Sequence, residues 1–351
     1  MWTRLVSLGE RLVLKHCFRL WVRRTMQLMK RSEMPITDET ELQEVPAIAE
    51  SAFVTSRTPH KDKLVAAIQN KKAEDDVAVL EAALAAYEEW ITALSSLKTK
   101  GRQRVDEMTS LLNAYKNHLE VDLILEKGSP FLTRQKGQMK LDNSVLEEFF
   151  MHLVRDEIID GLPKSDYLVG PQRAFMSLAF MPGSFESLFK KPDVVIKSKD
   201  QDFIIGANIN YSFSAGVEDV SGENVQSGTF AIAAMAAECK VNLDKTMFQE
   251  AAGTAARLKQ GCPFAKYYLI VEYLDMTPED VRLTAIDNVF LLRKAKRLPY
   301  EKRTDLASVR AQRDLNPISS DVIWKIVEEI QSTVKAVWYD PEEVFARGSF
   351  A

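Results

Sequence analysis

The hydrophobic period of this chain changes after about residue 160, and this change limits the fold classes that the chain can adopt. Between residues 61 and 160, apolar residues recur at three- and four-residue spacings, which is the pattern of amphipathic helices. Beyond residue 190, short β-branched and aromatic runs appear, of which YYLIVEYL at 267–274 is the clearest strand. This order predicts a mixed α/β (α+β) core with a helical domain in front of it.

The helical part is expected to contain two long helices at about 74–98 and 102–126, joined near Lys100-Gly101 as an antiparallel hairpin, and a third at 143–160. Strands are expected at 194–196, 203–205, 229–241 and 267–274, with a polar turn at 197–202 and a long loop at 212–228. Further helices are expected at 244–260, 278–297 and 320–338. Asp244 would cap the first of these, with Gly261 just beyond its end.

Two short motifs stand out in the strand-rich region. Pro192-Asp193 precedes the first predicted strand, and Glu238-Cys239-Lys240 lies near the end of the third. Strand side chains alternate between faces, so Glu238 and Lys240 project on the same side. If the first strand lies beside the third, Asp193 and Glu238 can share a metal ion, for which their oxygen ligands favour Mg²⁺.

This set of residues is sufficient for the hydrolysis of a phosphodiester. The ion would lower the pKa of a water molecule and stabilise the charge of the transition state. Lys240 would orient the attacking water, help to deprotonate it, or neutralise charge on the phosphate. The alternative is purely structural: Asp193 caps a turn, and Glu238 and Lys240 form a surface pair at a strand end.

The sequence from Glu238-Cys239-Lys240 through residues 241–259 and on to YYLIVEYLDM at 267–276 resembles the type II restriction endonucleases related to BbvCI, which recognise sites centred on C-T-N-A-G. The resemblance spans about 190–280. It implies a PD-(D/E)XK nuclease core, Mg²⁺-dependent cleavage of double-stranded DNA and, in several members, two different subunits that each cut one strand. It also implies that Asp193 and Glu238 bind metal and that Lys240 is the catalytic lysine. The cysteine at position 239 is a departure whose side chain would point away from the metal.

Other residues are candidates for supporting roles. A further carboxylate could come from Glu147, Glu148 or Glu157, although each also suits a solvated acidic face. Lys245 could hold a phosphate at the start of the helix that follows the motif. The best basic stretch for DNA contact lies at 293–303, which a charged, solvated helix end would also explain. Its basic residues are Arg293, Lys294, Lys296, Arg297, Lys302 and Arg303. Polar residues within 208–228 could form a loop that reads a DNA groove.

The net charge of −4 argues against a generic polyanion binder, but the charge is uneven. Residues 1–33 hold eight basic and two acidic residues, which suits either a targeting or membrane-surface helix or an extension without a role. Three cysteines and four scattered histidines predict neither a disulfide framework nor a zinc site. No apolar run is long enough for a transmembrane helix, and we expect no membrane contact and a cytoplasmic location.

The predicted domains are a basic leader and polar arm at 1–60, a helical domain at 61–164 and the nuclease core with C-terminal helices at 165–351. The predicted function is a type II restriction endonuclease of a restriction-modification system. Because cutting a duplex needs two active sites, we expect a homodimer or a heterodimer with a related second subunit. Two alternatives stay open: a structure-specific repair or junction nuclease on the same core, and a non-enzymatic helical interaction protein.

Overall fold

The computed structural model describes residues 56–215, 225–336, 338 and 340–348. They belong to one compact unit that spans Glu50–Ala351. The predicted leader at 1–33, most of the predicted arm and part of the predicted loop at 212–228 therefore lie outside the described residues.

The first part of the described chain is helical, as the apolar spacing predicts. Its elements are α2 (Pro59–Ile68), η1 (Lys71–Asp76), α3 (Val77–Ser96), α4 (Gly101–Asn117), the π-helix η2 (His118–Leu125), α5 (Pro130–Gln135) and α6 (Ser144–Leu153). Helices α3 and α4 correspond to the predicted pair, and the Trp90 and Tyr115 rings stack between them at a centroid distance of 4.7 Å. Helix α6 ends before the predicted limit of 160.

A mixed sheet of five strands follows, and it confirms the predicted fold class. The strands are β1 (Leu168–Phe180), β2 (Val194–Ser214), β3 (Val225–Leu243), β4 (Lys266–Leu274) and β5 (Asn288–Lys296), ordered as they are numbered. Strand β2 pairs antiparallel with β1 and with β3, whereas β3, β4 and β5 pair parallel. Strands β1 and β3 also meet in a parallel pairing at Ala174 and Ala231. The parallel pair β3 and β4 is joined by helix α7 (Lys245–Gly261), because parallel neighbours need a crossover connection.

The remaining elements are η3 (Ser187–Phe189), η4 (Val281–Leu283), η5 (Tyr300–Lys302), α8 (Leu306–Leu315), α9 (Ser320–Val334) and α10 (Pro341–Arg347). Helix α7 begins as predicted, with the Asp244 side chain accepting a hydrogen bond from the backbone N–H of Met247 at 2.8 Å. Helix α9 and strand β4 also lie where the sequence predicts them.

The strands differ from the predictions in four respects. The runs at 194–196 and 203–205 are not two strands around a turn, because both lie in the continuous strand β2. The segment predicted as a helix at 278–297 contains β5 instead. Strand β1 was not predicted, and its Pro171 falls at an irregularity in the pairing with β2. Strands β2 and β3 also run into the predicted loop at 212–228, as far as Ser214 and from Val225.

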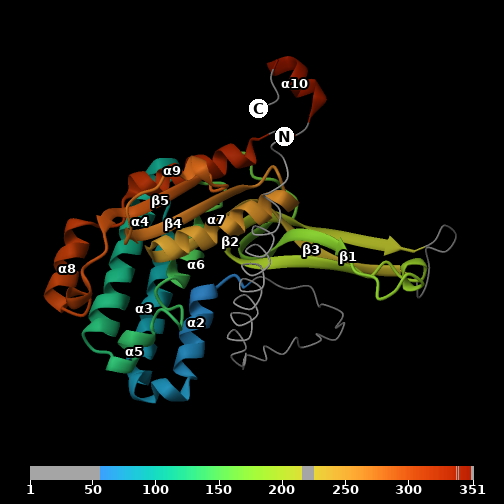
Figure 1. Cartoon of the computed structure of the whole chain (residues 1–351). Helices are drawn as coiled ribbons and strands as arrows, with labels where there is room; N and C mark the ends of the chain where they lie inside the picture. The colour runs from blue at the N-terminus through green and yellow to red at the C-terminus, as the bar shows by residue number, and fades with distance from the viewer. Residues whose placement is uncertain (1–55, 216–224, 337, 339, 349–351) are drawn as a thin grey trace, which may run out of the picture. The chain divides into compact units, whose positions relative to one another are not determined.

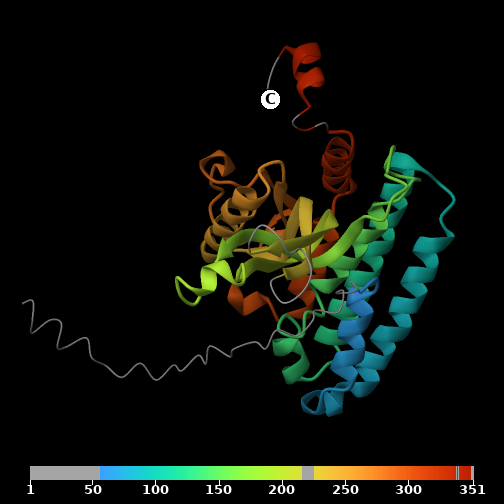
Figure 2. The ribbon, with the colours of Figure 1, turned by 90° about the vertical axis from the view of Figure 1, so that its right-hand side faces the viewer.

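The alternation of side chains along the strands builds two cores. Phe203 and Ile205 of β2 pack with the helices α3, α4, α6 and α9, whereas Ile204 packs with α7 on the opposite face. Strand β4 behaves in the same way, with Tyr268 and Ile270 on the first face and Leu269 on the second. The sheet therefore lies between α7 and the helices of the first part of the chain (Figure 2). A strand buried on both faces explains why YYLIVEYL is apolar almost throughout.

A buried network of charges ties the helical part to the sheet. Lys116 Nζ lies 2.6 Å from Glu120 Oε1 and 2.9 Å from Glu272 Oε1 of β4. Arg293 of β5 binds Glu272 at 2.8 Å, and Arg313 of α8 binds Glu120 at 2.6 Å. Burial would raise the pKa of Glu120, but the charges of Arg313 and Lys116 outweigh it and hold that pKa low. The predicted boundary at 164/165 therefore crosses one shared core, and the division into two domains stays a prediction.

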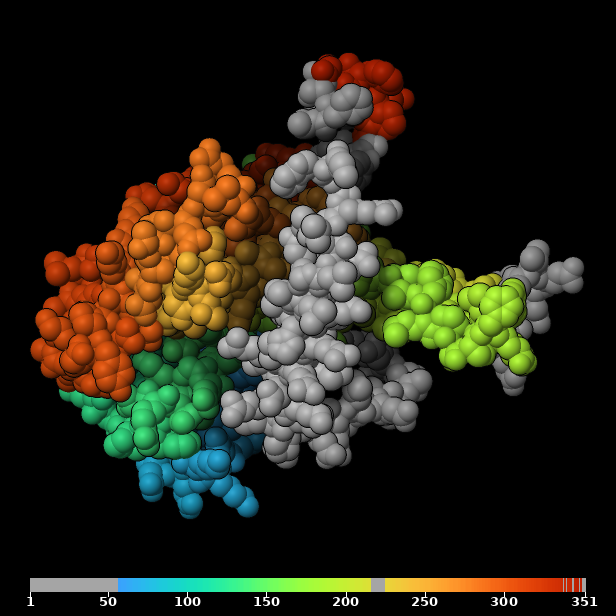
Figure 3. All heavy atoms as spheres, in the orientation of Figure 1, coloured from blue at the N-terminus to red at the C-terminus, as the bar shows by residue number. Residues whose placement is uncertain are grey.

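The strands β1, β2 and β3 extend beyond the helices that cover the rest of the sheet (Figure 1). The connection between β1 and β2 protrudes at the end of this extension (Figure 3). It carries Phe185 and Phe189, whose rings pack edge to face at 5.3 Å although the residues are 80% and 63% exposed. Among the described residues, no helix is long and apolar enough to cross a membrane.

Candidate active site

The pairing of β2 with β3 brings three chemically active side chains together. Phe203 is opposite Ala237, which makes Asp202 the neighbour of Glu238 across the two strands. The backbone N–H of Cys239 donates a hydrogen bond of 3.0 Å to Asp202 Oδ2. Lys240 Nζ lies 3.5 Å from Glu238 Oε2 and 3.8 Å from Asp202 Oδ2. As predicted, Glu238 and Lys240 share one face of the strand.

The structure does not bring Asp193 to this cluster. Asp193 precedes β2, and its backbone carbonyl accepts a hydrogen bond from the N–H of Met181 at 2.9 Å. It lies nine residues before Asp202, which corresponds to about 30 Å along an extended strand. Within one chain, the predicted sharing of a metal ion by Asp193 and Glu238 is therefore ruled out by the strand register. The carboxylate that lies beside Glu238 is that of Asp202, in a segment that the sequence predicts to be a turn.

The carboxylates of the cluster are mostly shielded from solvent but reachable. The side chains of Asp202 and Glu238 are 15% and 12% exposed, and that of Lys240 is 30% exposed. Tyr267 of β4 donates its hydroxyl hydrogen to Glu238 Oε1 at 3.0 Å, and Lys199 Nζ lies 3.9 Å from the same oxygen. One oxygen of Glu238 is thus fixed by a buried tyrosine, and the other faces Lys240.

Of the three acidic residues named as further candidates, Glu147 lies beside this cluster. Lys140 Nζ bridges the two groups, at 3.4 Å from Glu147 Oε1 and 3.2 Å from Asp202 Oδ1. Burial, reinforced by the negative charge of Asp202, raises the pKa of Glu147 to about 7. Glu148 instead accepts hydrogen bonds from the Tyr87 hydroxyl and the His60 backbone, and Glu157 is an exposed surface residue.

The donor set fits a hard divalent cation in its chemistry. Asp202 and Glu238 supply carboxylate oxygens, and Mg²⁺ is commonly bound through one or two carboxylates together with water and substrate phosphate. Within the described ranges, no group of three or more His, Cys, Asp or Glu side chains is close enough to hold a metal ion. Glu147 is therefore not part of a preformed three-carboxylate site, and Lys140 lies between it and Asp202.

The predicted DNA-contacting residues fall into three groups. Arg293 is 1% exposed and bound to Glu272, so its guanidinium is not available to DNA, and the prediction that it contacts DNA is wrong in this conformation. Arg297 and Arg303 both bind Asp275, at 3.0 Å and 3.3 Å. The four lysines of the prediction lie on the surface, and their contact with DNA stays a prediction. They are Lys245, Lys294, Lys296 and Lys302.

Two adjoining clefts border the cluster. A cleft of about 420 Å³ is lined by Asp202, Glu147 and Lys140, and also by Arg173 of β1. Arg173 lines a second cleft of about 760 Å³ as well, which we call the basic cleft. Its other charged lining residues are Lys197, Lys199 and Arg257. Neither cleft can be predicted from a local sequence pattern, because the lining residues come from separate elements.

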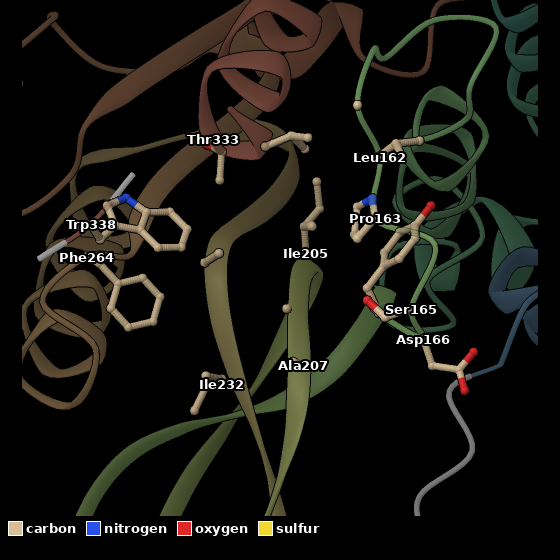
Figure 4. A pocket seen from close by; sticks show the side chains of 15 residues that line it. Leu162, Pro163, Ser165, Asp166, Ile205, Ala207, Ile232, Phe264, Thr333 and Trp338 are labelled. Atoms are coloured by element: carbon tan, nitrogen blue, oxygen red, sulfur yellow. The ribbon is translucent and has the colours of Figure 1, made fainter. Parts of the chain in front are cut away.

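A third cavity, of about 370 Å³, is mainly apolar and lacks the residues of the cluster (Figure 4). Phe264 and Trp338 lie side by side on one side of it, with a ring-centroid distance of 4.9 Å, and Leu162 and Pro163 lie on the other. Ile205 and neighbouring residues of β2 and β3 complete the lining. Asp166 supplies the single carboxylate among the residues that line this cavity.

The two carboxylates and the lysine on adjacent strands are groups with which a divalent ion could act on a phosphodiester. The comparisons with known proteins identify the class of enzyme. The sequence profile of the family described as Bpu10I restriction endonuclease matches residues 138–350. The chain belongs to this family and is a type II restriction endonuclease, a site-specific deoxyribonuclease that binds DNA. Enzymes of this kind generally use a divalent metal ion.

A solved structure supports the fold. It is described as the native BbvCI A2B2 tetramer at low resolution, and it matches 82% of this chain and 100% of its own with a TM-score of 0.58. The sequence identity is 20%, so the likeness bears on the fold alone. No curated protein sequence matches the chain significantly.

Proposed function

We propose that this restriction endonuclease hydrolyses phosphodiester bonds of double-stranded DNA with Mg²⁺, and that Asp202, Glu238 and Lys240 form its catalytic centre. The observation that carries the proposal is the contact of these side chains across β2 and β3. In the reaction, the oxygen of water bonds to phosphorus, one bridging P–O bond breaks, and the departing oxygen takes up a proton. The three residues of the cluster must therefore orient the water, stabilise charge or move that proton.

Asp202 and Glu238 are the residues that would hold the ion. A bound Mg²⁺ supplies positive charge that stabilises the phosphoryl transition state and makes water more acidic. Lys240, whose ammonium lies within 4 Å of both carboxylates, is placed to orient water or to neutralise charge on the phosphate. Glu147 is a further carboxylate that lines the same cleft, with Lys140 between it and Asp202.

A set of four variants tests this assignment and separates Asp202 from Asp193. We expect Asp202→Asn, Glu238→Ala and Lys240→Ala each to lower the cleavage rate with Mg²⁺ by at least 100-fold, because each removes a charge from the reacting centre. Binding to uncleaved DNA should remain. Asp193→Asn is the matched control and should cut at nearly the normal rate, since Asp193 lies nine residues before Asp202, the residue across from Glu238. Loss of cleavage in Asp193→Asn with normal cleavage in Asp202→Asn would refute the assignment.

We further propose that the active enzyme contains a second copy of the chain or a related second subunit. One chain places one such cluster within its described residues, whereas cutting a duplex requires hydrolysis on both strands. The similar solved structure is described as an A2B2 tetramer, and we therefore favour an enzyme with two different subunits. Supercoiled phage or plasmid DNA distinguishes the forms: a chain that works alone yields discrete linear fragments. A chain that needs a partner yields only nicked circles until its gene neighbour's product is added.

The sequence recognised, the dependence on Mg²⁺ rather than another divalent ion, and a cytoplasmic location belong to the same proposal. Discrete fragments from plasmid digestion would support a specific site, whereas a smear or cutting restricted to branched DNA would favour a structure-specific nuclease. Replacing Mg²⁺ by Mn²⁺ or by a chelator in the same assay establishes the metal requirement.

A further inference from the structure

The basic cleft beside the carboxylate cluster gathers positive charge in a chain whose net charge is negative. Four of its lining residues are cationic and none is acidic: Arg173, Lys197, Lys199 and Arg257. The whole chain has a net charge of −4, so this concentration is local. A cleft lined by one sign of charge focuses the electrostatic field and attracts ligands of the opposite sign.

The walls of the basic cleft come from three elements that the fold holds together. Strand β1 supplies Arg173, β2 supplies the two lysines, and α7 supplies Arg257. Lys199 donates a hydrogen bond to the Thr254 hydroxyl of α7, which fastens β2 to that helix. Arg257 is three residues after Thr254, so both project from one side of α7 toward Lys199.

Most of this charge is not neutralised by neighbouring residues. Lys197 and Arg257 are exposed, and neither has an acidic partner within 4 Å among the described residues. Arg173 lies 3.6 Å from Asp200, but both side chains are at least half exposed, and such pairs are weak in water. The cleft can therefore offer its cations to an external anion at little cost.

The position of the cleft indicates which anion it takes. Lys199 Nζ lies 3.9 Å from Glu238 Oε1, and Arg173 lines both the basic cleft and the cleft that contains Asp202. An extended polyanion in the basic cleft would therefore continue directly into the carboxylate cluster. The volume of about 760 Å³ and the three-element wall suit a strand backbone better than a single small ion.

We propose that the basic cleft binds the sugar–phosphate backbone of DNA next to the phosphate that is cleaved. This inference rests on the proposed function and extends it, because it identifies a DNA-binding surface distinct from the surface lysines around 294–302. Arg173, Lys197 and Arg257 hold phosphates, and Lys199 links that contact to Glu238.

The test measures how the affinity for DNA depends on salt. The triple variant Arg173→Gln, Lys197→Gln, Arg257→Gln removes three cations and leaves Lys199, Asp202 and Glu238 unchanged. The full chain, together with its second subunit if cleavage requires one, is titrated against a labelled 30-base-pair duplex from a phage fragment that it cuts. Ca²⁺ replaces Mg²⁺, so that binding is measured apart from cleavage.

Each lost phosphate contact reduces the slope of log K against log salt concentration by about 0.9, so the triple variant should lose about 2.7. At 0.1 M salt the affinity should fall by a factor on the order of 100. In the single variant Arg257→Gln the magnitude of this slope should fall by about 0.9. This variant provides an independent measurement if the triple variant is poorly folded. Because these side chains are exposed, melting temperatures should stay near that of the wild type.

A matched control removes three exposed lysines from the helical part: Lys71→Gln, Lys98→Gln, Lys127→Gln. It changes the net charge by the same amount and should keep the wild-type slope. An equal loss in both triple variants, or an unchanged slope in the cleft variant, would overturn the inference while leaving the nuclease function intact. A wild-type protein that neither binds nor cuts DNA would instead overturn the proposed function.

Discussion

Replacing Arg293 by alanine provides a sensitive test of how the structure distributes its basic residues. The sequence places Arg293 in a DNA-contacting stretch, whereas the structure buries it between the sheet and α8. Its guanidinium binds Glu272 at 2.8 Å, donates to the carbonyl of Asn316 at 3.1 Å and lies 5.5 Å from the centroid of the Tyr273 ring. Removal of Arg293 leaves Lys116 as the nearest remaining cation for the buried carboxylate of Glu272.

The cost of Arg293→Ala follows from this burial. Removing one partner of a buried ion pair destabilises a protein by about 3–5 kcal/mol, because the other charge stays in a poorly solvated place. Lys116 offsets part of that cost, since its Nζ lies 2.9 Å from the other oxygen of Glu272. We therefore expect a loss of about 3 kcal/mol in the free energy of unfolding and a fall in melting temperature of roughly 6–12 °C.

Arg297→Ala is the matched control from the same basic stretch. Arg297 binds Asp275 at 3.0 Å, but both side chains are about one-third exposed and Arg303 also reaches Asp275. Its removal should cost at most about 1 kcal/mol. Thermal and urea unfolding measure both variants, and the duplex titration measures their affinity for DNA. Normal stability of Arg293→Ala combined with weakened DNA binding would refute the buried position of Arg293.

Two further predictions concern a tyrosine beside the proposed catalytic cluster and a buried histidine. Tyr267→Phe removes the hydroxyl that donates to Glu238 at 3.0 Å, and should raise the Mg²⁺ concentration for half-maximal cleavage roughly tenfold with little change in melting temperature; unchanged metal dependence would contradict a positioning role. Burial, with the positive charge of Lys116, lowers the pKa of His60 to about 3. Below pH 6.5 the unfolded chain takes up a proton that folded His60 does not, so stability falls as the pH drops. Between pH 7 and pH 5, the free energy of unfolding of His60→Gln, measured in urea, should fall by about 2 kcal/mol less than that of the wild type. An identical pH dependence in the two proteins would show that His60 is not the cause.

The elements that the sequence predicts well are those whose own side chains determine them. In α3, Leu80, Tyr87 and Leu94 are seven residues apart and all buried, so the apolar period alone identifies the helix and its inner face. The start of α7 is equally local, because the Asp244 side chain satisfies the N–H of Met247 within the same turn. Such signals need no knowledge of the rest of the fold.

Strand β5 shows where a local pattern is insufficient. Its sequence, NVFLLRKAK, contains apolar residues at spacings that suit a helix as well as a strand, and its basic residues suggest a solvated end. Parallel pairing with β4 decides the outcome, since Phe290 and Leu292 complete one face of the sheet. The same pairing brings Arg293 against Glu272 and removes it from solvent. The pairing of β5 with β4 thus determines that this segment is a strand and that Arg293 is buried.

The position of Asp202 has a similar cause, and it explains why the local pattern does not indicate this residue as the neighbour of Glu238. Residues 197–202 are all polar, a composition typical of turns, yet β2 continues through them. Strands normally alternate apolar and polar residues because one face is buried. Here Lys197 and Lys199 line the basic cleft and Asp202 lies beside Glu238. Polar side chains thus occupy positions that would be apolar in a purely structural strand, and these are the side chains to which we assign binding and catalysis. The segment that breaks the strand pattern is therefore the one that carries the site, which is where a functional protein is expected to depart from local sequence rules.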